Sequence, residues 1–210
     1  MNAKRYLRAY TLKTYKFIAM ALLFAACTPE TFNSKEALWK YLKNPSNGYF
    51  QEKTINGYQF SLVHRPTDLL VLQELTDKTD EKKIESLRRK YQQNLYFNLS
   101  MSRDNKELLS TTPKNRAEFS AMVNQLAFGM GSKIALYNQQ QDTLPLMDYS
   151  YPRMYGMSRS TTMMFVYPRD PKKLKGTHLN FTIQDLGTYT GEVRFKIPIK
   201  KLRKEPRLNL

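Results

Sequence analysis

Hydrophobic positions along the chain follow two spacings, and each spacing predicts one kind of secondary structure. Spacings of three and four residues come early and predict helices that begin near residue 34, after Asp80 and at Thr112-Pro113. Spacings of two predict strands, including four in the last third, at 133–138, 161–167, 178–184 and 192–197. This order is typical of an α+β fold, expected here as a single domain with a mostly antiparallel sheet and about three to four helices packed on it.

The clearest local signal is Asn56-Gly57, which separates two alternating segments at 49–55 and 58–64. A two-residue Asn-Gly connection favours a tight turn with positive φ at both positions. The two segments are therefore predicted to pair as a β-hairpin. A further strand is expected at 95–102, before a turn at Asp104-Asn105.

The first two predicted helices carry recognisable terminal and pairing signals. Asn33 as the N-cap, with Glu36 three residues later, fits a capping box at the start of the first helix. Asp80 is the expected cap of the second helix. On its exposed side Glu85 is expected to pair with Arg89 one turn later.

The third helix is expected to begin with Pro113 in its first position, where the missing N–H costs nothing. Its apolar stripe, which should pack on the sheet, consists of Phe119, Met122, Val123 and Leu126. Segment 69–75 is almost wholly apolar, so helix and strand both remain open there.

Cys27, the only cysteine, follows a basic leader and a short apolar run. Residues 1–16 hold five Lys and Arg and no acid, and residues 17–26 are all apolar. This layout is that of an export signal. The stretch 23–27, Leu-Phe-Ala-Ala-Cys, resembles a bacterial lipobox, in which signal peptidase II cuts before a diacylglyceryl cysteine. It departs from the usual pattern at Phe24, where the family generally has Leu.

The lipobox resemblance implies a signal peptide at 1–26, a lipidated N-terminus with a short tether at 27–34, and a domain at 35–210. A diacylglyceryl group together with an amide-linked chain such as palmitate gives stable membrane anchoring. Lipidation consumes the thiol and thereby excludes a disulfide or a catalytic cysteine. Two alternatives are an uncleaved membrane anchor and a buried cytosolic thiol, but ten apolar residues are fewer than the roughly 17–25 that span a bilayer.

The charge balance is strongly basic, with 34 Lys and Arg against 18 Asp and Glu. Without residues 1–26 the chain keeps 29 cations and 18 acids, a net charge of +11. A positive field attracts anions, and for an exported protein these are anionic glycans, lipid head groups or envelope proteins; no nucleic acid is expected. The alternative is a solvated surface that serves solubility.

No pattern of residues predicts catalysis. The two histidines, His64 and His178, are 114 residues apart and fit no metal-binding spacing, and no serine-nucleophile or phosphate-loop motif occurs. The chain is interpreted as a non-enzyme without cofactor or metal. A binding or structural role follows, as an accessory subunit of an outer-membrane assembly. Alternatives are a periplasmic carrier of a lipid or small ligand and an envelope hydrolase that uses Asp/Glu chemistry.

Segment 147–159 is the candidate partner-binding surface, because tyrosine, methionine and arginine are enriched at interfaces. It is expected to be a long loop. Its candidate contact residues are Tyr149, Tyr151, Arg153, Tyr155 and Arg159. The alternatives are aromatic side chains that fill the edge of the core, and a copper(I) site at Met154 and Met157 that lacks a nearby histidine.

The tripeptide 142–144, Asp-Thr-Leu, resembles the O-glycosylation sequon of exported Bacteroidota proteins and makes Thr143 a candidate acceptor. With the lipobox and the Tyr-, Asn- and Lys-rich composition, the chain resembles uncharacterised envelope lipoproteins of that phylum. The resemblance implies a location and no activity. Surface-exposed members often carry an acid-rich signal after the cysteine, whereas here only Glu30 and Glu36 follow, so the periplasmic face of the outer membrane is expected.

Overall fold

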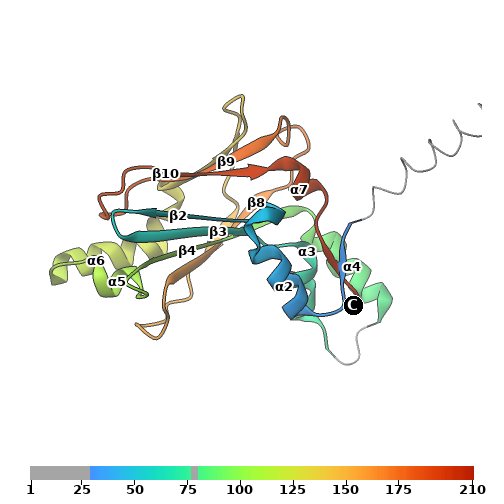
Figure 1. Cartoon of the computed structure of the whole chain (residues 1–210), viewed down its shortest axis with the longest axis horizontal. Coiled ribbons are helices and arrows are strands. Elements are labelled where there is room, and N and C mark those ends of the chain that lie inside the picture. The colour runs from blue at the N-terminus through green and yellow to red at the C-terminus, as the bar shows by residue number, and fades with distance from the viewer. Residues whose placement is uncertain (1–28, 77–79) are drawn as a thin grey trace, which may run out of the picture. The chain divides into compact units, whose positions relative to one another are not determined.

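Two antiparallel sheets lie one above the other in the computed structural model, which describes residues 29–76 and 80–210 (Figure 1). The larger sheet has the strand order β2 (Phe50–Ile55), β3 (Tyr58–His64), β4 (Asn94–Arg103), β8 (Thr161–Pro168), β7 (Asp148–Ser150). The smaller sheet has the order β10 (Val193–Pro198), β9 (His178–Ile183), β5 (Ile134–Tyr137), β6 (Thr143–Leu144). The α+β class and the mostly antiparallel pairing are confirmed, although the strands form two facing sheets instead of one.

Helices gather at the two ends of these sheets (Figure 1). One end carries α2 (Lys35–Lys43), the short 3-10 turn η2 (Pro45–Asn47), α3 (Thr67–Glu74), α4 (Glu81–Tyr91) and α7 (Ile199–Arg203). The other carries α5 (Leu108–Thr111), α6 (Arg116–Asn124), the π-helical turn η3 (Gln125–Gly129) and the 3-10 turn η4 (Met130–Ser132). The parallel pair β1 (Thr31–Phe32) and β11 (Arg207–Leu208) joins the beginning and end of the unit 31–210.

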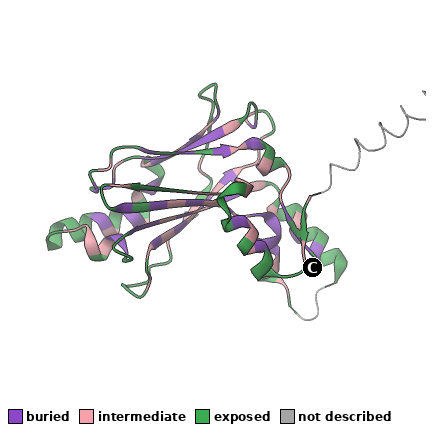
Figure 2. Cartoon of the chain, viewed as in Figure 1, coloured by how far each residue is buried: buried purple, intermediate pink, exposed green. Residues whose placement is uncertain are grey.

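The main core lies between the facing sheets, because the strands alternate apolar residues inward and polar residues outward. Phe181 of the smaller sheet meets two rings of the larger one, with centroids 6.0 Å from Phe97 and 5.7 Å from Phe165. All three are fully buried. Figure 2 shows the buried residues concentrated along the strands. Tilted and edge-on aromatic pairs of this kind add stability beyond the apolar area that they bury.

The outer edges of the two sheets are closed by different means. On one side Gln51 of β2 accepts from the Lys196 N–H of β10 at 3.2 Å and donates to the Lys196 carbonyl. On the other side, β6 and β7 are joined directly by residues 145–147. Unpaired strand edges expose N–H and C=O groups that can pair with another chain, and the Gln51 side chain occupies two of these groups on β10.

A second core at the α2, α3 and α4 end holds the C-terminal strand in place. Asp68 is 3% exposed and receives two hydrogen bonds from the Arg88 guanidinium, each 2.9 Å long. Asp68 also accepts from the Leu208 N–H at 2.8 Å, and Arg88 donates to the Leu208 carbonyl at 3.0 Å. This ion pair therefore fixes β11 to α3 and α4.

Glu205 makes a second charged contact in the same region. Its carboxylate accepts from the Thr67 N–H and hydroxyl and pairs with Arg169, and His64 Nε2 lies 3.2 Å away. Burial alone would raise the pKa of Glu205, but His64, Arg169 and the Thr67 N–H lower it to about 2. The ionised carboxylate thus joins the C-terminal segment to β3 and to the end of β8.

The hairpin and the strand predictions are confirmed. Asn56 and Gly57 have φ values of 50° and 80°, and strands pair on both sides of them. Segment 69–75 falls mostly in a helix, α3, and not in a strand.

Three local predictions were wrong. The N-cap of α2 is Ser34, whose hydroxyl accepts from the Ala37 N–H, and not Asn33. Glu85 pairs with Arg88 at 3.1 Å instead of Arg89, because Arg88 faces the buried Asp68. Helix α6 begins at Arg116 and not at Thr112-Pro113, because the Asn115 side chain caps it by accepting from the Glu118 N–H.

Candidate functional site

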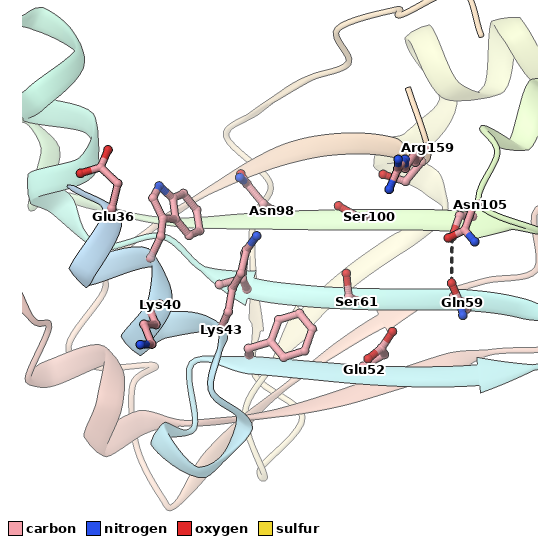
Figure 3. Close-up of a pocket in the computed structure, with 15 residues that line it drawn as sticks. Glu36, Lys40, Lys43, Glu52, Gln59, Ser61, Asn98, Ser100, Asn105 and Arg159 are labelled. Atoms are coloured by element: carbon pink, nitrogen blue, oxygen red, sulfur yellow. Dashed lines mark hydrogen bonds between the residues drawn. The ribbon is translucent and has the colours of Figure 1, made fainter. Parts of the chain in front are cut away.

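The outer face of the larger sheet forms an open groove of about 990 Å³, called here the sheet-face groove (Figure 3). Helix α2 borders one end, strands β2, β3 and β4 form the floor, and the segment before β8 borders the other end. Its lining residues are Glu36, Trp39, Lys40, Lys43, Phe50, Glu52, Gln59, Ser61, Val63, Asn98, Ser100, Ser102, Asn105, Arg159 and Ser160.

Strand alternation makes the floor of the groove polar. In β3, Phe60 and Leu62 point into the core while Gln59 and Ser61 occupy the opposite face. Strand β4 repeats the pattern with polar residues at 98, 100 and 102. One face of each strand thus packs into the core, and the other face carries side-chain amides and hydroxyls.

Strand register places these polar side chains in a row across the sheet. Glu52 lies opposite Ser61, Ser61 opposite Ser100, and Ser100 opposite Thr162. Neighbouring strands are about 4.8 Å apart, and the Ser100 and Thr162 hydroxyls are within 2.9 Å of each other. The result is a line of hydroxyl groups that ends at a carboxylate.

The next row toward α2 is more apolar. Phe50 lies opposite Val63, and Val63 lies opposite Asn98. Helix α2 adds Trp39 to this end of the groove. The Asn98 Oδ1 atom is shielded from solvent and has no hydrogen-bond partner among the described residues, so it is an unsatisfied buried acceptor beneath the groove surface.

Helix α2 presents a charged stripe to the groove because its other face is anchored in the second core. Leu38 and Leu42 are fully buried. Glu36, Lys40 and Lys43 therefore lie on the opposite side of the helix, at the spacing of one helical face. Figure 3 shows them at one end of the groove and Arg159 with Asn105 at the other, with Ser61 and Ser100 between.

The predicted partner-binding residues divide into two groups. Residues 148–150 form strand β7, so segment 147–159 is not entirely a loop. Tyr149 is half-buried and stacks on Phe165 with ring centroids 5.8 Å apart. Tyr151 is also half-buried against the core, and burial, with a smaller effect of Glu107, raises its pKa. These two aromatics fill the edge of the core.

The remaining members of that segment face solvent. Tyr155 is 74% exposed, and the Arg153 guanidinium lies 4.8 Å from its ring centroid. Arg159 lines the sheet-face groove. The segment is held by the Ser158 N–H, which donates to the buried Glu107 at 3.0 Å. The structure thus separates the five predicted contact residues and brings only Arg159 into the groove.

Thr143 is exposed on the two-residue strand β6, as a glycan acceptor requires. The Asp142 before it accepts from the Asn138 amide at 3.0 Å. Cys27, the predicted lipidation site, lies outside the described residues. Across 29–76 and 80–210, no three His, Cys, Asp or Glu side chains come together as a metal site.

Sequence reasoning missed the sheet-face groove. The alternating polar residues at 59 and 61 and at 98, 100 and 102 were its only signal. Such alternation predicts a solvent-facing strand side, and only the pairing register shows that these residues share one face with α2.

No helix in the described part of the chain is long and apolar enough to cross a membrane. Comparisons with protein families, with curated proteins and with solved structures find no match to this chain. The function must therefore be argued from the chemistry of the groove and from the N-terminal sequence.

Proposed function

We propose that the protein is a lipid-anchored binding protein of the cell envelope whose sheet-face groove takes a saccharide. The observation that carries the proposal is the combination of aromatic rings, amides and hydroxyls along one open groove of about 990 Å³. The N-terminal lipobox supports the envelope location and the anchor at Cys27.

A saccharide has apolar C–H faces and a rim of hydroxyl groups. At the α2 end of the groove, Trp39 and Phe50 offer apolar ring faces on which the C–H faces of a saccharide can stack. The amides and hydroxyls on the floor can each donate or accept, which suits hydroxyl partners. Asn98 lines the same floor, and its side-chain amide would bond one ligand hydroxyl.

The other candidate functions fit the groove less well. A hydrolase that uses two carboxylates generally needs one of them in an apolar site that raises its pKa. Glu36 and Glu52 line the groove, but both are exposed. A lipid carrier would need an enclosed apolar cavity, whereas this groove is open and twelve of its fifteen lining residues are polar or charged. Partner binding through the exposed Arg153 and Tyr155 stays a separate prediction.

The anchor is tested by labelled fatty-acid incorporation and membrane fractionation of the wild type beside Cys27→Ala. We expect both the label and membrane retention to depend on Cys27. A soluble, unlabelled wild type would overturn the envelope part of the proposal and would bring nucleic acid back as a partner of the basic surface.

Saccharide binding can be followed through Trp39, since it is the only tryptophan in the chain and lines the groove. Titration with neutral oligosaccharides such as maltotetraose should change its fluorescence and give heat in calorimetry. Phe50→Ala should weaken this binding about tenfold, while Tyr189→Ala, an exposed aromatic outside the groove, should not. The absence of binding to both neutral and acidic oligosaccharides would refute the saccharide proposal.

A further inference from the structure

Three cations line the sheet-face groove without a counter-charge of their own. Lys40, Lys43 and Arg159 make no ion pair and no hydrogen bond to another described residue. Other cations of the structure, such as Arg88 and Arg169, are paired with carboxylates. The groove cations therefore remain available to a ligand.

Their positions are set by well-packed elements on both sides. Helix α2 carries the two lysines and is anchored by its buried leucines. Arg159 follows Ser158, whose N–H donates to Glu107, a carboxylate that is only 2% exposed. Because the backbone at these positions is fixed, ligand binding has to order only the cationic side chains themselves.

We infer that the sheet-face groove selects acidic saccharides, with acid groups bound by Lys40 and Lys43 at one end and by Arg159 at the other. The inference rests on the proposed saccharide-binding function and names its ligand class. Hydrogen bonds between a cation and a carboxylate or phosphate are roughly twice as strong as neutral ones. An acidic saccharide would therefore form stronger hydrogen bonds with Lys40, Lys43 and Arg159 than a neutral saccharide would.

The groove also contains two carboxylates, Glu36 and Glu52. Glu52 ends the row of hydroxyls on the floor, where it can accept from saccharide hydroxyls. Glu36 lies one turn before Lys40 on α2. Because three cations line the groove beside these two carboxylates, the lining keeps a net positive charge and favours acid groups at the cation-bearing ends.

The length of the floor points to an oligomer. From Asn98 to Ser102, β4 rises four residues, or about 13 Å at 3.3 Å per residue. A single sugar acid would reach only one cationic end. An acidic oligosaccharide reaches both, so its affinity should exceed that of the monomer.

The acid group can belong to a free polysaccharide or to the head group of a glycolipid. The protein used is the mature chain, residues 27–210. It is titrated with tetragalacturonate, maltotetraose and galacturonate, and binding is followed by Trp39 fluorescence and calorimetry. A second set of titrations uses zwitterionic vesicles with and without a phosphorylated glycolipid. The variants are Lys40→Ala/Lys43→Ala and Arg159→Ala, with Lys172→Ala/Lys175→Ala as a control of equal charge outside the groove.

We expect tetragalacturonate, or the glycolipid vesicle, to bind at least about tenfold more tightly than maltotetraose or the plain vesicle. The groove variants should weaken tetragalacturonate binding about tenfold more than they weaken maltotetraose binding. Equal affinity for tetragalacturonate and maltotetraose, together with equal affinity for the glycolipid vesicle and the plain vesicle, would overturn the inference while the proposed function stands. An equal loss in the Lys172/Lys175 control would also overturn it, because attraction to overall charge would then explain the binding.

Discussion

Arg88 and Arg89 are neighbours on α4, but the structure indicates that only Arg88 contributes substantially to stability. The Arg88 side chain is 16% exposed and bonds the buried Asp68, Glu85 and the Leu208 carbonyl. Arg89 is exposed. Sequence spacing favoured Arg89 as the partner of Glu85, so paired substitutions test the structure against the sequence pattern directly.

Replacing Arg88 with Met keeps much of the aliphatic stem but leaves Asp68 as a buried carboxylate without its cation. Breaking such a pair generally costs about 3–5 kcal/mol. The partial exposure of Arg88 places the expected loss at the lower end, about 3 kcal/mol of unfolding free energy. For a domain of this size this lowers Tm by roughly 6–12 °C. Arg89→Met should change stability by less than about 0.5 kcal/mol.

Urea denaturation and thermal melts of both variants give the comparison. Asp68→Asn added to Arg88→Met should recover part of the loss, since the buried charge is then gone. If Arg88→Met and Arg89→Met lose the same small amount, or if the double variant is no more stable than Arg88→Met, the reasoning about this ion pair is wrong.

Two further predictions concern acid stability and the aromatic segment. Because the pKa of Glu205 is lowered to about 2, its contribution of roughly 3 kcal/mol should be complete above pH 4.5 and disappear as the pH falls toward 2. Urea melts across this range should show a weaker pH dependence for Glu205→Gln; an unchanged dependence would contradict the ion-pair account. Tyr149→Ala should cost about 2 kcal/mol, whereas Tyr155→Ala should leave thermal stability unchanged and reduce co-purification if the segment binds a partner. Equal losses of stability in Tyr149→Ala and Tyr155→Ala would contradict the assignment of Tyr149 to the edge of the core and of Tyr155 to the surface.

Local sequence signals predicted the elements that depend on a few neighbouring residues. Asn56-Gly57 specifies a turn with two positive φ values, and the structure has that turn. The four late strands follow from alternation alone. Where two caps compete, the sequence was insufficient: Asn33 and Ser34 are both good N-caps, and the packing of Leu38 and Leu42 decides where α2 begins.

Features that depend on long-range pairing could not be predicted. Nothing near Asp68 in the sequence indicates that its partner is Arg88, because the pair forms only when α3 and α4 pack together. The sheet-face groove has the same origin. Ser61 and Ser100 are 39 positions apart and become neighbours through the β3–β4 register. Sequence spacing cannot supply this register, nor the β7–β8 pairing that turns Tyr149 toward the core while Tyr155 stays exposed.

The proposed anchor and the groove are connected through α2. Thr31 is held by the pairing of β1 with β11, and three residues lie between it and Cys27, so a fully extended chain over these four residue steps would span at most about 14 Å. Helix α2 begins at Lys35 and carries the lysines at one end of the groove. A lipid on Cys27 would therefore leave only a short tether between the anchor and the folded unit 31–210. An acidic saccharide carried at the membrane surface would then meet the groove at a raised local concentration.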